Sequence, residues 1–590
     1  MTISANYPAI RPSLLLDFSN TKQLDPRITF SRPTTATYYD GKTVAKAEEN
    51  LWLQSQLFSN ASWSKFALTL TDNATTAPDG TSTATSFVPT ASSTYHYMYQ
   101  DTYVRSSTVT VSFYAKSNGY NYATITDASV SNLRAVFDLS LVTATLTGTN
   151  ANLTLTNPTI TSVGNGWYRC SVTYNCTNAT PAIIPLPTST TSPAGTWAGD
   201  GTSGIYIWGA QLEQRSSVTA YTPTTTAPIT NYIPALQTAA ANVARFEHDP
   251  VTGESKGFLI EEQRTNLVTY SEQFDSWSKY GATVTENIVV SPSGTLKGNK
   301  LIENTGTGLH SIYKILTLSN TVYTLSFYMK AGERTIGGIY TNNPGDSFTY
   351  FNLSTGTVGT VGHTSATIQA VGNGWYRCSV VFTPTAANCN ISPFSAATDG
   401  SYSYTGDGFS GLYIWGAQLE AGSFPTSYIP TVASQVTRSA DSASMTGSNF
   451  SSWYRADEGT LYSEASCQRV NGSTGPLFLS SGTANNIGQY SADQFHLYVR
   501  KNNILQVNLD GGTYVAGQFI KNAGAYKVND FAVSLNGGLA TASSNGGLPE
   551  VSALYIGTGD QGTAPIGGTI KRIAYYPKRL SNTELQAITS

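Results

Sequence analysis

The feature that most constrains the fold of this 590-residue chain is an internal repeat. The segment VGNGWYRCSV at Val163–Val172 occurs again, letter for letter, at Val371–Val380. A second segment, Gly199–Glu213, matches Gly406–Glu420 with two changes, and the offset between the copies drifts only from 216 to 207 residues. Insertions between the copies are therefore loop-sized. The repeat predicts two modules of roughly 170 residues, the size of one β-sandwich.

Each copy has the pattern of strands. Short runs alternate apolar and polar residues and end at Gly, Asn, Asp or Pro, whereas helical periodicity is nearly absent. Period-two alternation places one set of side chains in a core and their neighbours on the other face. In module 1 the predicted core set is Val109, Val111, Phe113, Ala115, Tyr168, Cys170, Val172, Tyr174, Ile205 and Ile207. We therefore predict an all-β, multidomain fold of antiparallel β-sandwiches: two jelly-roll modules, a third sandwich and a small N-terminal β-unit.

Strand-like stretches flank the first module on both sides. Leu14–Phe18, Ile28–Arg32 and Ala36–Asp40 precede it, and residues 242–265 follow it with a hairpin around Asp249–Lys256. Insertion into a loop is tolerated where the two ends lie close together. We therefore predict a discontinuous N-terminal unit of residues 1–49 and 226–265, with module 1 inserted as residues 50–225. Module 2 then spans residues 266–436.

Residues 437–590 form another strand-rich block. Its strand-like runs are Gly459–Cys467, Phe495–Val499, Ile504–Leu509, Tyr526–Leu535, Ala553–Ile556 and Gly568–Tyr576. After Pro577, Ser581 and Glu584 precede Leu585 with the spacing of a capping box, in which two side chains satisfy free amides at the start of a helix. The sequence predicts a third sandwich that ends in one short helix.

Composition excludes several classes of protein. Charged residues make up 12% of the chain, against a usual share of about 25%, and the net charge is −3, which argues against a nucleic-acid partner. No apolar run approaches the ~20 residues that span a bilayer, and the first twenty residues lack the pattern of a signal peptide. Cys170, Cys378 and Cys467 lie in strand-like runs and are expected as small buried residues in a reducing compartment. With scattered histidines and no CxxC pair, we expect no metal and no cofactor.

Several motifs carry a resemblance. The pattern Asn-Leu-x₆-Phe followed by Trp-Ser-Lys, the motif SFYxK and the run IYIWGAQLE resemble the jelly-roll carbohydrate-binding modules common in structural proteins of tailed bacteriophages. RPSLLLDFSNTKQLDPRITFSRPTTATYYDGK and ARFEHDPVTGESKGFLIEEQRTNL resemble the segments that flank such modules in virion proteins. The closing GGTIKRIAYYPKRLSNTELQAIT resembles the concanavalin A-like (laminin-G-like) sandwich that often ends these chains. Relatives often carry a calcium-binding carboxylate on the last module strand, where this chain has Ile207-Trp208 and Ile414-Trp415. That departure argues against a structural calcium ion.

Catalytic motifs are interpreted as turns. Gly253–Gly257 fits G-x-S-x-G and Gly557–Gly562 fits G-x-G-x-x-G, but neither lies between a strand and a helix. The acids that could form a glycosidase pair are either adjacent in sequence, and so point to opposite faces, or lie in Gly-Asp-Gly turns; they are Glu261, Glu262, Asp457, Glu458, Asp200 and Asp407. We expect no enzymatic activity and no catalytic residue.

Sugar binding is the favoured chemistry. Sugar sites stack an aromatic ring on a pyranose and orient it with a few polar groups. On the faces opposite the predicted cores, module 1 carries Tyr114, Trp167, Arg169, Tyr206 and Trp208, and module 2 carries Tyr328, Trp375, Arg377, Tyr413 and Trp415. If these strands are neighbours, each module presents an aromatic–cationic patch. For these rings we favour an architectural interpretation over an open sugar site: Trp167 packs on Arg169, and a loop, a flanking domain or another subunit covers the rings.

A third candidate surface belongs to module 1 alone. Tyr95, Tyr97 and Tyr99 alternate with His96 and Met98, so the three rings lie on one face, where the second copy has Leu309, Ser311 and Tyr313. We favour ordinary sheet packing for this face, with a ligand site as the alternative. His96 and His310 occupy matching positions and are interpreted as satisfied structural residues.

The resemblance implies a virion structural protein, a tail fibre, spike, head fibre or decoration subunit, made in the host cytoplasm and exposed on the phage particle. Its N-terminal region would bind other virion proteins, and its modules would bind host-surface polysaccharide, with weak sites strengthened by multiple copies. By analogy with phage fibres we expect a homotrimer, no nucleic-acid partner and no membrane insertion. The alternatives are a purely structural decoration or assembly protein without sugar binding, a polysaccharide depolymerase, and a secreted bacterial adhesin.

Overall fold

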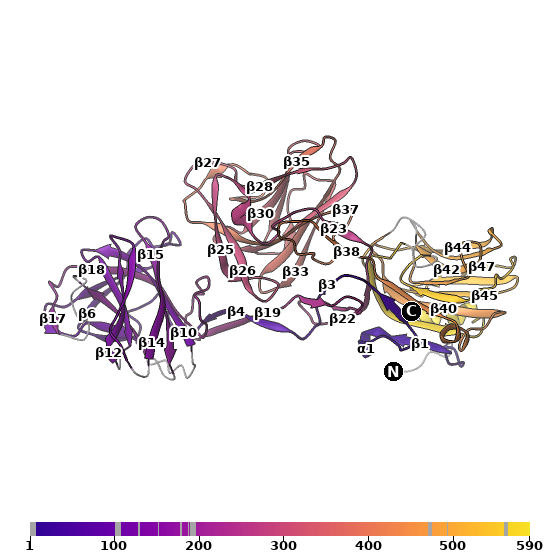
Figure 1. Ribbon diagram of the computed structural model, residues 1–590, viewed down its shortest axis with the longest axis horizontal. Coiled ribbons are helices and arrows are strands. Elements are labelled where there is room, and N and C mark those ends of the chain that lie inside the picture. The colour runs from indigo at the N-terminus through magenta and orange to yellow at the C-terminus, as the bar shows by residue number, and fades with distance from the viewer. Residues whose placement is uncertain are drawn as a thin grey trace.

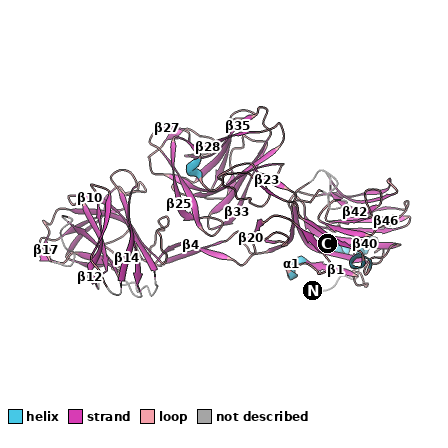
Figure 2. Cartoon of the chain, viewed as in Figure 1, coloured by secondary structure: helices cyan, strands magenta, loops and turns pink. Residues whose placement is uncertain are grey.

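The computed structural model describes residues 7–100, 108–127, 130–150, 153–176, 180–186, 188, 196–469, 475–491, 494–559 and 564–590. Figure 1 shows three β-sandwiches in an elongated arrangement, with module 1 at one end, module 2 in the middle and a third sandwich at the other end. The C-terminus and the first described strand, Leu14–Asp17, lie at the third sandwich, and the described helices are short (Figure 2). The predicted all-β class of antiparallel sandwiches is confirmed.

Module 1 consists of two six-stranded antiparallel sheets. One sheet contains, in order, β14 (Leu153–Ser162), β15 (Tyr168–Cys176), β10 (Thr108–Asn118), β18 (Gly204–Glu213), β7 (Ala84–Pro89) and β6 (Leu68–Thr75). The other contains β13 (Thr143–Thr147), β12 (Val130–Asp138), β11 (Tyr122–Asp127), β16 (Pro181–Leu186), β9 (Tyr97–Tyr99) and β5 (Ser64–Phe66). A small pair, β8 (Ser93–Thr94) and β17 (Trp197–Ala198), lies outside them.

The predicted alternation in module 1 is confirmed by the burial of its core. Nine of the ten predicted core residues are at most 1% exposed, and Tyr168 packs half-buried at the edge of the cluster. Cys170, Cys378 and Cys467 are fully buried, each in the core of a different sandwich. Burial raises the pKa of all three thiols.

Module 2 repeats this plan. Its first sheet contains β25 (Ala282–Val290), β26 (Leu296–Glu303), β37 (Gly411–Ala421), β29 (Tyr323–Ala331), β34 (Trp375–Phe382) and β33 (Ser365–Gly372). Its second contains β24 (Ser278–Tyr280), β28 (His310–Thr317), β35 (Asn388–Ala396), β30 (Ile336–Thr341), β31 (Ser347–Asn352) and β32 (Thr357–Val358). A 3₁₀ turn, η1 (Phe274–Ser276), precedes β24, and β27 (Thr307–Gly308) pairs with β36 (Tyr404–Thr405).

The third sandwich, which we call the hub, has sheets of eight and seven strands. The larger contains β21 (Phe246–His248), β22 (Ser255–Ile260), β49 (Gly568–Tyr576), β40 (Glu458–Ser466), β45 (Phe519–Lys527), β46 (Asp530–Leu535) and β47 (Thr541–Ser543), with β1 (Leu14–Asp17) also on β49. The smaller contains β2 (Thr29–Ser31), β39 (Ser442–Thr446), β48 (Ala553–Ile556), β41 (Leu477–Ser480), β42 (Asn486–Ser491), β43 (Gln494–Lys501) and β44 (Ile504–Thr513). Its helices are α1 (Phe18–Thr21), α2 (Ser448–Ser451) and α3 (Asn582–Thr589), and the capping box predicted at Ser581 and Glu584 is confirmed.

The expectation of a separate N-terminal β-unit is wrong. β1 pairs with β49, β2 pairs with β39, and the β21–β22 hairpin extends the larger hub sheet. Leu14, Phe18 and Phe258 accordingly lie in the hub core. Strands from both ends of the sequence complete this sandwich, because their apolar side chains pack together in its core.

The segments that connect these hub strands to module 1 pair with each other instead of joining the hub sheets. β3 (Ala36–Tyr38) pairs with β20 (Gln237–Ala239), and β4 (Val44–Asn50) pairs with β19 (Ile229–Pro234), which together we call the ribbon. The ribbon connects module 1 to the hub and passes beside module 2 (Figure 1). Module 2 leaves and rejoins the hub through β23 (Arg264–Asn266) and β38 (Val436–Arg438). Both modules are therefore insertions in the hub.

A buried ion cluster joins the separate passages of the chain through the hub. Arg32, Arg245 and Asp441 are fully buried. Asp441 contacts Arg32 at 3.1 Å and Arg245 at 2.6 Å, and Arg245 also contacts Glu261 at 2.7 Å. Burial would raise the pKa of Glu261, but Arg438 and Arg245 lower it to about 2. Because buried charges require partners, this cluster fixes how passages before, between and after the modules meet.

Candidate functional site

The predicted patch on module 2 exists, but the ribbon covers it. Tyr328, Trp375 and Trp415 are between 0% and 3% exposed. They pack in one cluster with Tyr39, Ala47 and Ile233 of the ribbon segments, and with Tyr428, Val289, Val290 and Val371. These rings dock the ribbon, so the sugar-binding interpretation does not hold here and the covered, architectural one does. Tyr413 alone of the predicted rings of this module remains partly exposed.

Arg377 belongs to the same covered face. It is 8% exposed, lies 5.5 Å from the centre of the Tyr328 ring, and donates to Ser326 Oγ and, at 2.6 Å, to the Thr426 carbonyl oxygen. Its donors are therefore satisfied by the protein itself. The architectural alternative describes this face.

In module 1 the matching rings are covered by the module's own segments. Trp167 is 1% exposed and donates to the Thr76 carbonyl oxygen at 3.0 Å, and Trp208 is 3% exposed and donates to Thr83 Oγ1 at 3.0 Å. The turn between β6 and β7 thus closes over both indoles, so they too are not open rings. Tyr206 is partly exposed. Arg169 lies 5.4 Å from the centre of the Tyr114 ring, whereas we expected it against Trp167.

A cleft of about 390 Å³ lies between this face of module 1 and module 2. The structure brings Tyr114, Arg169 and Trp208 to one wall and Tyr413 to the other. A backbone hydrogen bond of 2.8 Å from Ala220 to Ile288 joins the two walls. Four predicted site residues from two modules therefore line one cavity. Sequence reasoning missed Lys300, Glu333 and Phe409 on the module 2 wall. Phe409 is one of the two changes between the matched segments Gly199–Glu213 and Gly406–Glu420, whereas Lys300 and Glu333 lie in no motif.

The third predicted surface is open. Tyr95 is 43% exposed and Tyr97 and Tyr99 are half-buried, whereas His96 and Met98 are buried, so the predicted alternation is confirmed. Phe66 on neighbouring β5 lies opposite Tyr97, is 45% exposed, and stacks on it with ring centres 5.5 Å apart and planes at 12°. Tyr97 and Tyr99 are 5.9 Å apart. We call Phe66, Tyr95, Tyr97 and Tyr99 the aromatic row.

Phe66 was missed by sequence reasoning, although a signal existed. It follows the Trp-Ser-Lys motif, and the same place in module 2 holds Tyr280, which is 59% exposed. An aromatic residue at a matched, solvent-facing position of both copies could have identified it. In module 2 the residue opposite is Ser311 rather than a tyrosine, so no row forms on β24 and β28.

Module 2 has an aromatic stack of its own that the sequence analysis did not single out. Phe348 lies between Tyr340, at 4.5 Å, and Tyr402, at 4.3 Å, with nearly parallel planes. Tyr402 is 45% exposed. Tyr340 donates to Asp346 at 2.7 Å, which fixes the end of the stack.

The matched histidines are structural, as interpreted from the sequence. His96 bridges the carbonyl oxygens of Ala67 and Trp197 at 2.7 and 2.9 Å, and His310 bridges those of Gly281 and Tyr404 at 2.6 and 3.1 Å. Both rings are buried and each packs on an aromatic neighbour at 4.5 Å. Each histidine ties two loops together at the same place in its module.

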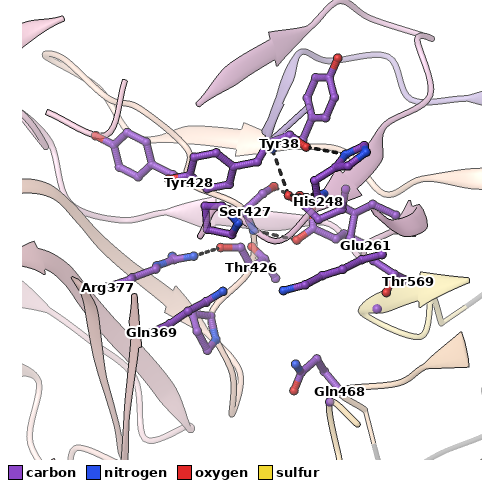
Figure 3. Close-up of a pocket in the computed structure, with 18 of the residues that line it drawn as sticks. Tyr38, His248, Glu261, Gln369, Arg377, Thr426, Ser427, Tyr428, Gln468 and Thr569 are labelled. Carbon is purple, nitrogen blue, oxygen red and sulfur yellow. Dashed lines mark hydrogen bonds between the residues drawn. The ribbon is translucent and has the colours of Figure 1, made fainter. Parts of the chain in front are cut away.

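A polar pocket of about 240 Å³ lies where the ribbon, module 2 and the hub meet (Figure 3). Ser427 donates to Glu261 from its amide at 2.7 Å and from its hydroxyl at 2.6 Å, and Arg377 donates to Thr426. Burial raises the pKa of Glu247, also on this wall, to about 7, although the amides of Tyr39 and His248 donate to it. Glu261 is held ionised by its arginines, so it has no proton to donate as a general acid. The polar groups here mainly bind one another.

The remaining acids also have structural partners. Glu262 contacts Arg264 and Arg469, whereas its neighbour Glu261 contacts Arg245. Asp200 and Asp407 each accept backbone amides two and three residues ahead, which is turn chemistry. Gly253–Gly257 forms the turn and start of the β21–β22 hairpin, whereas residues 560–562 of the other glycine motif lie outside the described residues.

The described part of the chain contains no group of three or more His, Cys, Asp or Glu side chains placed to hold a metal ion. Among the same residues, no helix combines the length and the apolar character needed to cross a bilayer.

Comparison with known proteins gives a fold-level likeness. The chain matches no protein-family model and no curated protein. Among solved structures it is similar to the tandem CBM22 domains of Paenibacillus barcinonensis Xyn10C, with 10% identity over 64% of this chain and 98% of that chain and a TM-score of 0.19. It is also similar to domains LG4-5 of the mouse laminin α1 chain, with 11% identity, 46% and 85% coverage and a TM-score of 0.15. The LG1-3 region of the laminin α2 chain is also similar, with 9% identity over 82% of this chain and 96% of that chain and a TM-score of 0.15. At such scores no functional argument rests on these likenesses.

Proposed function

We propose that the protein is a non-enzymatic structural subunit of a tailed-bacteriophage particle, a tail fibre, spike or head fibre, that attaches the particle to host-surface glycans. The observation that carries the glycan-binding part is the aromatic row. Its rings lie partly open on adjacent strands, whereas most other predicted rings are used to hold segments and domains together. Flat, partly exposed rings with little conformational freedom suit the apolar faces of pyranose sugars.

The particle context rests on the sequence motifs that flank and close the chain. The N-terminal strands belong to the hub, so contacts to other virion proteins through the N-terminal region would be made by the hub. Module 1 lies at the far end of the molecule from the hub (Figure 1), which suits a projecting binding domain. We further propose a homotrimer, assembled in the host cytoplasm, in which several weak sites act together.

One alternative has an observation in its favour. Eight of the thirteen predicted sugar-contact residues are buried: Tyr114, Trp167, Arg169, Trp208, Tyr328, Trp375, Arg377 and Trp415. This favours a purely structural particle protein in which aromatic residues serve domain docking alone. The two functions differ in whether the aromatic row binds sugar.

The test is binding of the full-length protein to purified host-surface polysaccharide, measured by biolayer interferometry. We expect Phe66→Ala and Tyr97→Ala to weaken binding at least tenfold, which is about 1.4 kcal/mol. Tyr280→Ala is the matched control, because it removes an exposed ring at the equivalent place in module 2, and it should leave the affinity unchanged.

Wild-type affinity in all three variants would remove the aromatic row as the binding site. No binding by the wild type would remove the glycan-binding proposal and leave the purely structural function. Release of reducing ends from the polysaccharide would replace it with a depolymerase.

A further inference from the structure

Arg169 is a buried cation with unused hydrogen-bonding capacity. It is 8% exposed, its Nη2 donates to Ser112 Oγ at 3.1 Å, and its Nε is buried without a partner. Among the ion pairs of the described residues, none involves Arg169. Buried charges are normally paired, because the loss of hydration is otherwise uncompensated.

Arg377, the matched arginine of module 2, shows how the guanidinium donors are satisfied where the face is covered. Nε and Nη2 of Arg377 donate to Ser326, and Nη1 donates to the Thr426 carbonyl oxygen. The matched glycines Gly164 and Gly372, three residues before the tryptophans, also differ in whether another segment covers them. A Cβ on Gly372 would lie 2.5 Å from Pro234 of the ribbon, whereas a Cβ on Gly164 would meet nothing within 4 Å. This position is thus covered by the ribbon in module 2 and uncovered in module 1, where Gly164 lines the cleft.

The other charges at the cleft have partners. Lys300 contacts Glu333 at 2.8 Å and lies 4.4 Å from the centre of the Phe409 ring. Asp79 accepts hydrogen bonds from the amide and hydroxyl of Thr81. Among the described residues, Arg169 is therefore the cleft cation that makes no ion pair, although its charge opposes the rise that burial causes in the pKa of Glu213.

The cleft has the size and lining of a small-ligand site. Its volume of about 390 Å³ lies in the range of roughly 300–1,000 Å³ typical of such sites. Beside Arg169 it combines the partly exposed ring of Tyr413 with the hydroxyl groups of Thr161, Ser171 and Thr285. An aromatic surface, several hydroxyl partners and one unpaired guanidinium match a sugar ring that bears a carboxylate.

We infer that the cleft between the two modules binds an acidic saccharide, with its carboxylate on Arg169. A guanidinium can bind a carboxylate through two parallel hydrogen bonds, and Arg169 lines the cleft. The inference rests on the proposed glycan-binding function and adds a second site, distinct from the aromatic row, that selects for negative charge.

The experiment uses the full chain and calorimetric titration with hyaluronate, alginate and polysialate oligosaccharides, each beside its carboxyl-reduced form and beside acetate. We expect at least one acidic oligosaccharide to bind ten times more tightly than its reduced form, and acetate to bind far more weakly. Arg169→Gln should abolish this preference and Arg169→Lys should restore part of it. Thr285→Trp, at an exposed position of the module 2 wall, should block the cleft without touching a buried group.

Tyr97→Ala is the control that separates the two sites, because it should weaken binding at the aromatic row and leave the charge preference intact. Thermal unfolding of every variant shows whether it is folded; if Arg169→Gln is not, Arg169→Lys and Thr285→Trp decide. An unchanged charge preference in the folded variants, or acetate binding as tight as that of the sugars, would overturn the inference while the proposed function stands. Failure of the wild type to bind any saccharide would overturn both.

Discussion

Gly372 of module 2 lies directly against Pro234 of the ribbon, and a Cβ at Gly372 would come within 2.5 Å of Pro234 Cδ. The ribbon can seat there only because the position has no side chain. Gly164 is the matched residue of module 1 and has a similar left-handed backbone, with φ of +89° against +97°, but open space around it. The pair therefore separates backbone strain, which both positions share, from the contact with the ribbon.

Gly372→Ala should destabilise the protein by about 1–3 kcal/mol more than Gly164→Ala, because overpacking adds to the strain that both substitutions cause. Denaturant unfolding of the two variants beside the wild type measures the difference. Equal losses in the two variants would show that Pro234 gives way and that the ribbon contact is soft.

Asp441→Asn should cost about 3–5 kcal/mol, since it leaves the buried guanidinium groups of Arg32 and Arg245 without their shared carboxylate. The expected effect is a loss of hub stability seen in equilibrium unfolding. Asp457→Asn is the control: Asp457 pairs with Arg455 at 2.6 Å on the surface, where solvent screens the interaction, so its loss should change the stability little. A loss in Asp441→Asn no larger than in the control would contradict the role given to the cluster.

Glu247 and Glu261 line the polar pocket where the ribbon, module 2 and the hub meet, and they should make opposite contributions to the pH dependence of stability. Burial raises the pKa of Glu247 to about 7, so between its ordinary value and pH 7 the folded protein holds a proton that the unfolded chain has lost. Stability from this group therefore falls as the pH rises through that window. Glu261, whose pKa is lowered to about 2, contributes stability that is lost only in acid, as the pH falls from its ordinary value toward 2.

Glu247→Gln should accordingly match the wild type near pH 5 and be more stable by about 1–3 kcal/mol at pH 8. Glutamine can still accept the amide hydrogen bonds of Tyr39 and His248. Thermal unfolding at both pH values checks this, and a variant with the same advantage at pH 5 as at pH 8 would refute it.

Trp208 and Trp415 occupy the same place in the two modules but differ in one hydrogen bond. Trp208 Nε1 donates to Thr83, whereas Trp415 Nε1 is buried without a partner. Substitution by phenylalanine removes the same volume from both, so Trp208→Phe should cost about 1–2 kcal/mol more than Trp415→Phe. Calorimetry with hydrogen–deuterium exchange to assign each module measures the difference; a larger loss in Trp415→Phe would contradict it.

Much of each sandwich interior could be predicted from the sequence because a strand's alternation is local information. Val111 and Val172 are buried as expected, and Tyr95, Tyr97 and Tyr99 do share a face opposite His96 and Met98. The β21–β22 hairpin and the capping box at Ser581 were predictable for the same reason. In each of these cases the deciding residues lie within a few positions of one another.

What the alternation could not show is what covers the other face of a sheet. Trp375 and Trp415 pack in one buried cluster with Ile233 and Tyr39. Both partners belong to the ribbon segments and are far from the tryptophans in the sequence. The cluster of Arg32, Arg245 and Asp441 is equally invisible, because its members come from three separate passages of the chain. Arg169 and Arg377 have identical sequence surroundings, and only the fold makes one satisfied and the other not.

The insertion of both modules in the hub has a consequence for biosynthesis. Ser13 donates its amide to Tyr575, a separation of 562 residues, and β1 pairs along β49. At translation rates of roughly 5–20 residues per second, the first hub strand waits on the order of half a minute to two minutes for its partner. Both jelly rolls can be complete on the ribosome while Leu14 and Phe18 still lack the surface that will shield them. β1 is thus made long before β49, the strand that pairs with it, and a chaperone that shields β1 would act while the chain is still being translated.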